Sequence, residues 1–124
     1  MCCIAFLRRA LFALALLLCT AGVSFADFAA IAYSPSTGRY GYSYGQPTRG
    51  VAETVALDHC NMSDARIVVW VENGFVALAL GDTRGAYGYG WSTVSRAAAE
   101  RIALNQARGR TGGVYVAAWA YSGE

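Results

Sequence analysis

The residues best suited to acid–base or nucleophilic chemistry are few. His59 is the single histidine of the chain and stands beside Cys60. Adjacent residues of a helix point about 100° apart, so this pair is poorly placed as a base and its nucleophile. A metal site needs several converging ligands, and one histidine with one cysteine does not supply them. We therefore expect no catalytic dyad, no metal and no cofactor from this pair.

Two carboxylates at matching places in a sequence repeat, Glu53 and Glu100, form a second candidate. If the fold brought them together, they could act as an acid and a base. Each is also suited to the first turn of a helix, where the helix dipole favours an acid, or to a salt bridge with Arg49, Arg96 or Arg101. We prefer one of these two structural roles and keep an enzyme, or an enzyme inhibitor, with a Glu/Arg site as an alternative.

Aromatic residues at every second position of two stretches, 40–45 and 87–91, form the third candidate. Alternate side chains of a strand point to opposite faces, so each stretch predicts a strand with one aromatic face. Covered faces would belong to the core, whereas open ones would form a broad aromatic platform able to bind a glycan or a protein. The predicted binding residues are Tyr40, Tyr42, Tyr44, Tyr87, Tyr89 and Trp91.

Both aromatic stretches belong to an internal duplication. Residues 28–32 match residues 75–79 at an offset of 47 positions, and the match continues without a gap through the following segment. After a shift of two positions Trp70 matches Trp119. A long match at fixed spacing indicates a duplicated structural unit. We expect repeat one to span 28–71 and repeat two to span 75–121.

Each repeat is predicted to have the order β-β-α-β. An apolar strand, a turn rich in glycine and polar residues and the aromatic strand form a hairpin. A helix with an alanine-rich stripe follows, capped by Thr48 in the first repeat and by Ser95 in the second. Asn73-Gly74 between the repeats is typical of a tight hairpin turn. The predicted strands are 28–33, 39–45, 66–71, 75–80, 86–91 and 114–121.

The repeats predict an α+β fold: two tandem β-β-α-β repeats form a largely antiparallel sheet of about six strands, with two helices packed on it. The alanine stripes would let the helices sit close to the sheet, against glycines of the aromatic strands. A pseudo-twofold axis is expected to relate the two repeats. An arrangement in which units are exchanged between the halves is an alternative.

Residues 1–26 have the pattern of a secretory signal peptide. Arg8 and Arg9 form the positive region, 10–18 is apolar, and Ser24-Phe-Ala26 is a cleavage site. The alternative is an uncleaved membrane anchor, but the apolar run is short for a span of about 20 residues. We expect an exported protein, periplasmic or secreted, whose single domain is 27–124.

Charge excludes some partners. Of the 10 basic residues two belong to the leader, so 27–124 has eight arginines, eight acids and no lysine. A formally neutral domain without a basic patch does not indicate nucleic-acid binding. Contact with a membrane is expected only through the leader, if it is retained.

Cys60 is the single cysteine outside the leader and cannot form an internal disulfide. We expect it to be a small buried apolar residue of the first helix. The alternatives are a reactive thiol or an intermolecular disulfide, which would make a homodimer.

Nine short motifs of the chain occur together in one known family. They are Ala30–Tyr44, Ala52-Glu53, Ala56-Leu57, Cys60, Val68–Trp70, Ala77–Asp82, Tyr87–Trp91, Ala99-Glu100 and Val116–Trp119. As a set they resemble the bacterial domain of unknown function family 4189. The resemblance covers nearly all of 27–124 and implies a small exported domain with no established activity, so it implies no catalytic residue. Members usually carry further cysteines, and Ala65, Phe75 and Ala107 stand where these are expected.

The sequence as a whole therefore predicts a non-enzymatic exported domain that acts by binding another protein. A glycan or cell-wall binding module that uses the aromatic faces is the first alternative. An enzyme or inhibitor with the Glu/Arg site is the second.

Overall fold

The computed structural model describes residues 26–123, so the predicted leader lies almost entirely outside the described residues. The described chain has six strands and two helices, and it confirms the α+β class and the tandem β-β-α-β order. The elements are β1 Phe28–Tyr33, β2 Tyr40–Gln46, α2 Arg49–Cys60, β3 Arg66–Glu72, β4 Phe75–Leu80, β5 Tyr87–Ser92, α3 Arg96–Arg108 and β6 Tyr115–Tyr121.

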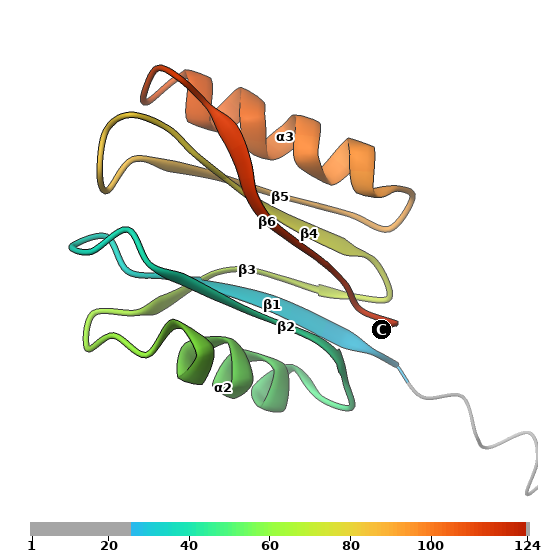
Figure 1. The fold of residues 1–124 in the computed structure, drawn as a ribbon. Coiled ribbons are helices and arrows are strands. Elements are labelled where there is room, and N and C mark those ends of the chain that lie inside the picture. The colour runs from blue at the N-terminus through green and yellow to red at the C-terminus, as the bar shows by residue number, and fades with distance from the viewer. Residues whose placement is uncertain (1–25, 124) are drawn as a thin grey trace, which may run out of the picture.

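The strands form two separate antiparallel sheets of three rather than the single sheet of about six that we expected. β1 is the central strand of the order β2-β1-β3, and β4 is the central strand of the order β5-β4-β6. Figure 1 shows the two sheets stacked face to face, with α2 on the outer face of one and α3 on the outer face of the other. The domain therefore has four layers, in the order helix, sheet, sheet, helix.

The division into two sheets follows from the central strands, which are apolar on both faces. Ala30 and Ala32 of β1 pack beneath α2, while Ile31 and Tyr33 point the other way into a core shared by both sheets. Leu78 of β4 faces them in the same core. A single open sheet would leave this face in water, and burying each such aliphatic side chain stabilises the fold by roughly 1.5–3 kcal/mol.

Asn73 and Gly74 form the predicted tight turn, but the turn does not close a hairpin. Asn73 has a φ of 53°, and the turn carries the chain from β3 in one sheet to β4 in the other. Ser122 holds this turn at the end of β6: its Oγ accepts a hydrogen bond from Gly74 N at 2.8 Å. Its carbonyl accepts another at 2.8 Å from Gly45 N, at the end of β2. β4 pairs with β5 and β6, which leaves β3 at the edge of its own sheet.

Both helices begin at the predicted caps and approach their sheets very closely. Thr48 Oγ1 accepts a hydrogen bond from Val51 N, and Ser95 Oγ accepts one from Ala98 N. A Cβ added to Gly41 would lie 2.3 Å from Cys60 N, and one added to Gly88 would lie 2.1 Å from the carbonyl oxygen of Ala103. The space between helix and sheet is therefore too small for any side chain on these strand positions.

The two repeats differ in length at the end of their helices. α2 has 12 residues and α3 has 13, and the loop 109–114 is one residue longer than the loop 61–65. α2 ends at Asn61, which has a left-handed backbone with a φ of 52°, whereas α3 ends at Gly109 with a right-handed one. The shift of two positions found in the sequence match lies here.

The helix–sheet contact predicts opposite effects for two glycine-to-alanine substitutions. Gly88→Ala is expected to lower the free energy of unfolding by about 1–3 kcal/mol, because the new methyl group overlaps the backbone of α3. Gly50→Ala, in α2 where an added Cβ meets nothing within 4 Å, is expected to raise it by up to about 1 kcal/mol. Urea unfolding followed by circular dichroism measures both. Equal stability of the two variants would contradict the close packing.

Candidate functional site

The six predicted aromatic residues lie on the faces of β2 and β5 that point away from the helices. Between them Gly41 and Ser43 on β2, and Gly88 and Gly90 on β5, are buried against the helices. Because side chains alternate along a strand, this choice of small residues directs every aromatic ring of these strands to the other face.

These rings do not form one continuous platform. β2 and β5 are edge strands of different sheets, and when the sheets stack, β5 lies against β3 while β2 lies against β6. The two aromatic strands therefore occupy opposite edges of the sandwich. Tyr44 and Trp91 are 52% and 55% exposed, whereas Tyr87 and Tyr89 are half-buried and pack against the shared core. Of the two expected alternatives for the aromatic faces, the core applies in part to Tyr87 and Tyr89, and the open surface applies to Tyr44 and Trp91.

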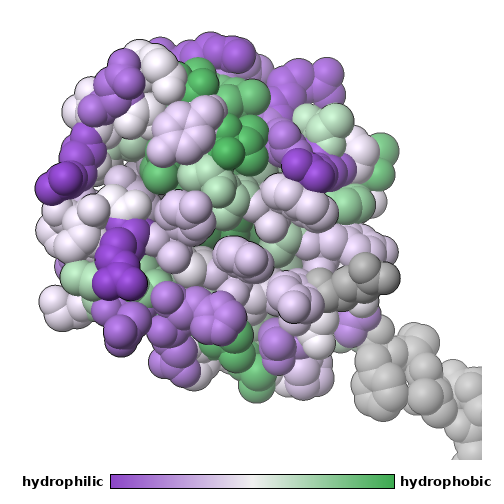
Figure 2. Space-filling model, in the orientation of Figure 1, coloured by the Kyte–Doolittle hydropathy of each residue, from purple (hydrophilic) through white to green (hydrophobic). Residues whose placement is uncertain are grey.

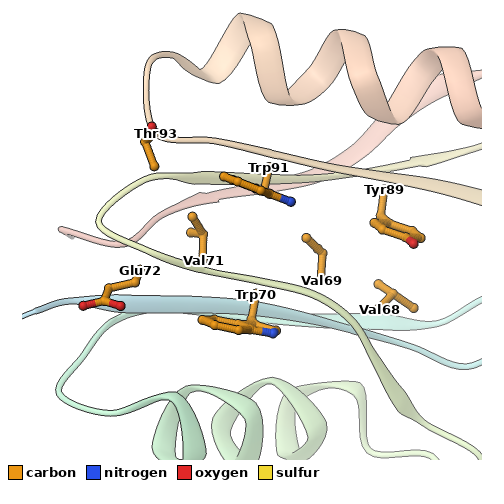
Figure 3. A pocket seen from close by; sticks show the side chains of 8 residues that line it. All are labelled: Val68, Val69, Trp70, Val71, Glu72, Tyr89, Trp91 and Thr93. Atoms are coloured by element: carbon orange, nitrogen blue, oxygen red, sulfur yellow. The ribbon is translucent and has the colours of Figure 1, made fainter.

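At one edge the strands β3 and β5 enclose a groove of about 410 Å³ (the β3/β5 groove). Figure 3 shows Val69 and Val71 pointing from β3 toward β5, and Tyr89 pointing from β5 into the groove. Glu72 and Thr93 lie at one end of it. The lining is mostly aliphatic and aromatic, and Glu72 is its one charged residue. The lining residues are Val68, Val69, Trp70, Val71, Glu72, Tyr89, Trp91 and Thr93.

At the opposite edge β2 and β6 enclose a smaller groove of about 280 Å³ (the β2/β6 groove). It is lined by Tyr42, Tyr44, Trp119, Ala120 and Tyr121. The duplication relates the two grooves: Tyr42, Tyr44 and Trp119 match Tyr89, Trp91 and Trp70. The two repeats therefore form two equivalent grooves, one where β3 faces β5 and one where β2 faces β6.

Each groove has a tryptophan that an arginine fixes in place. The guanidinium of Arg49 lies 4.1 Å from the centroid of the Trp70 ring, and that of Arg96 lies 3.9 Å from the centroid of Trp119. Such contacts contribute about 0.5–1 kcal/mol at exposed sites. Neither tryptophan belongs to the two stretches of alternating aromatic residues, because Trp70 lies on β3 and Trp119 lies on β6. Their match across the repeat is the sequence signal that could have identified them.

Glu53 and Glu100 complete these clusters and are not brought together. Glu53 forms a salt bridge with Arg49 at 3.0 Å, and Glu100 forms one with Arg96. α2 and α3 lie on opposite outer faces of the sandwich, so the two carboxylates share no site. The expected salt bridges to Arg49 and Arg96 are confirmed, whereas the expected first-turn position is wrong, because neither acid lies in the first turn of its helix. The pairs hold the arginines over the tryptophan rings.

Cys60 is fully buried at the end of α2, as expected for a small apolar residue. Its Sγ lies 3.5 Å from the carbonyl oxygen of Arg39, and burial raises the pKa of the thiol. A thiol that is inaccessible and kept protonated is unsuited to an intermolecular disulfide in the folded domain. His59 is exposed beside it, and its ring meets the Tyr42 ring edge-on at a centroid distance of 6.5 Å.

A polar cluster outside the grooves ties two loops together. Ser34 Oγ donates a hydrogen bond to Asp64 Oδ1 at 2.5 Å, and Ser36 N donates one to Asp64 Oδ2 at 3.0 Å. Thr37 Oγ1 donates to Ser34 Oγ at 2.7 Å. These bonds, the one from Ser34 first, lower the pKa of Asp64 to about 2. The cluster joins the β1–β2 loop to the α2–β3 loop, and a carboxylate with so low a pKa is too weak a base to activate a hydroxyl.

No group of three or more His, Cys, Asp or Glu side chains among residues 26–123 is arranged to hold a metal ion. In the same range no helix has the length and apolar character that crossing a membrane requires.

The fold and its grooves define a four-layer α+β domain made of two β-β-α-β units. The family model described as Domain of unknown function (DUF4189) matches residues 28–122, and the chain belongs to this family. The resemblance noted in the sequence is thereby confirmed. Comparison with curated proteins and with solved structures gave no match.

The positions of the three tryptophans predict their accessibility to acrylamide. Trp91, Trp119 and Trp70 are 55%, 40% and 37% exposed, so all are expected to be quenched, with Trp91 the most. Variants that keep one tryptophan and replace the other two by phenylalanine separate the three signals. A shielded Trp91 in a monomeric variant would contradict the open edge.

The pKa of Asp64 predicts a contribution to stability that depends on pH. Because the folded pKa is below the unfolded one, the charged carboxylate stabilises the fold above about pH 4, and this contribution is lost as the pH falls toward 2. The difference in unfolding free energy between wild type and Asp64→Asn should therefore be largest near neutral pH and vanish near pH 2. Asp58→Asn, at an exposed position of α2, is the control that also removes one carboxylate. A difference that persists unchanged to pH 2 would refute this role.

Proposed function

We propose that this protein is a small non-enzymatic domain, exported to the periplasm or the cell exterior, that binds an extended segment of a partner protein in the β3/β5 groove. The observation that carries the proposal is the coincidence of an apolar groove with a free strand edge. β3 pairs with β1 on one side, and no described strand pairs with its other side.

The groove has the dimensions and chemistry that an extended chain needs. Five consecutive residues of β3, 68–72, run along one wall. An added strand would form main-chain hydrogen bonds with this edge and place alternate side chains in the groove. Val69 and Val71 form the buried floor of the groove, the partly buried Val68 and Tyr89 supply apolar contacts, and the half-exposed ring of Trp91 covers the opposite wall.

Charge and apolar surface further define the segment. Glu72 at the end of the groove is the one charged residue of the lining, so a basic residue at the corresponding end of the bound segment would be favoured. Aliphatic or aromatic side chains at alternate positions would cover an apolar surface that is otherwise in water. The export component of the proposal rests on the signal-peptide pattern of residues 1–26.

Synthetic peptides test this function. A peptide that alternates valine and threonine and ends in one arginine is expected to protect Trp91 from acrylamide in the variant with Trp70→Phe and Trp119→Phe. Trp91→Ala in the wild-type background should weaken binding about tenfold or more, since central aromatic residues carry much of the energy of an interface. Fluorescence measures the protection of Trp91, and calorimetry measures the affinity for the peptide. In Glu72→Gln, the peptide that ends in arginine should bind no more tightly than the same peptide without the arginine.

Tyr44→Ala is the matched control, because Tyr44 occupies the equivalent place in the other groove. It should leave peptide affinity unchanged. If Trp91→Ala and Tyr44→Ala have equal effects, or if no peptide protects Trp91, binding of a protein segment in the β3/β5 groove is wrong.

A further inference from the structure

The edge formed by β2 and β6 has a concentration of exposed aromatic rings that the opposite edge does not have. In the orientation of Figure 2, pale side chains of intermediate hydropathy occupy much of the centre of the molecule, with strongly hydrophilic ones toward the margins. Five of the six exposed rings on these two strands are tyrosines. They are Tyr40, Tyr42, Tyr44, Tyr115, Trp119 and Tyr121.

The β2/β6 groove differs in chemistry from its duplicate. Where the β3/β5 groove has Val71 and Glu72, this groove has Ala120 and Tyr121, and where the other has Trp91 it has Tyr44. The lining therefore loses aliphatic bulk and its charged residue and gains phenol hydroxyls. A phenol offers both an apolar ring face and a group that donates and accepts hydrogen bonds.

Three of the four rings that line this groove are held by neighbours outside it. Arg96 stacks on Trp119 at 3.9 Å, and Phe75 stacks on Tyr121 with ring centroids 4.7 Å apart. His59 meets the edge of the Tyr42 ring. Rings that are already fixed lose little freedom when a ligand binds, so the groove is organised in advance.

We infer that the β2/β6 groove is a second binding site, which takes a neutral sugar ring of an oligosaccharide. The axial C–H groups of a pyranose carry partial positive charge and fit the negative face of an aromatic ring. Its equatorial hydroxyls fit the phenol groups and the indole N–H at the ring edges. A lining without charged residues fits a neutral sugar, and the nearest cation, Arg96 on the Trp119 ring, is already paired with Glu100.

This ligand class fits the groove better than the extended protein segment proposed for the other edge. The groove is smaller, at about 280 Å³ against about 410 Å³, and Ala120 replaces the valine found at the matching place in the other groove. The sugar site uses different residues and a different ligand from the peptide site. Either can therefore be absent without consequence for the other.

The test uses the purified protein with Trp70→Phe and Trp91→Phe, so that Trp119 alone reports. The probes are cellotetraose, maltotetraose and the tetramer of N-acetylglucosamine, with an oligogalacturonate as the charged comparison. At least one neutral probe is expected to give a saturable change in Trp119 fluorescence and protection from acrylamide, and the charged probe is expected to give neither. Calorimetry on the wild type should give a Kd in the millimolar range or below.

Variants then place the sugar in the groove. Tyr44→Ala should weaken sugar binding about tenfold, corresponding to one hot-spot contact, and Tyr44→Phe, which keeps the ring and removes the hydroxyl, should weaken it less. Trp91→Ala should leave sugar binding unchanged. Circular dichroism checks that each variant is folded, and Tyr44→Phe retains the test if the alanine variant is not.

Four results would overturn the inference. They are the absence of a saturable Trp119 signal with every neutral probe, equal binding of the oligogalacturonate, equal losses in Tyr44→Ala and Trp91→Ala, and protection of Trp119 that rises with protein concentration before any sugar is added. The last result would assign the groove to a second copy of this chain. Failure of the peptide experiment at Trp91 would not change the outcome here.

Discussion

The structure depends on one steric constraint, the direct contact of each helix with the backbone of its sheet. Alanines of α2 and α3 face Gly41, Gly88 and Gly90 so closely that one additional carbon would overlap helix backbone. Since neighbouring residues of a strand point to opposite faces, small residues toward the helix leave the other face for large ones. The arrangement of the aromatic rings is therefore a consequence of how the helices pack.

Local structure could be read from the sequence to a large extent. The Thr48 and Ser95 caps, the alanine stripes and all six strands follow from side-chain chemistry and spacing, and the observed strand bounds lie within one residue of the predicted ones. The stacking of two sheets did not follow from the same patterns. Its signal is the continuous apolar run of Phe28–Tyr33, which alternation cannot explain and which indicates a strand covered on both faces. Asn73-Gly74 specifies a tight turn but not whether the two strands that it joins will pair.

The sequence predicted which residue types form the candidate site, but not which of these residues lie together in the fold. The six aromatic residues are where alternation puts them, yet sheet stacking divides them between two edges and buries part of the β5 set. Trp70 and Trp119 line the rims of the grooves from strands that the aromatic pattern does not include. The matching positions of Arg49 and Arg96, of Glu53 and Glu100, and of the two tryptophans contained this information, because residues kept together in a duplicate can be in contact. Only the structure shows that each arginine contacts both the glutamate and the tryptophan of its own repeat.

The width of the sheets has a consequence for molecules that meet this domain. Strands in a sheet are about 4.8 Å apart, so the two edges of a three-stranded sheet are separated by only about 10 Å. Two macromolecules that each occupied one edge would lie on opposite sides of the domain, separated by little more than the width of one sheet. Their relative orientation would be set by the packing of the two sheets and not by a flexible linker. If both edges bind as proposed, a tandem duplication within one small chain is sufficient to hold two ligands on opposite sides of one rigid body.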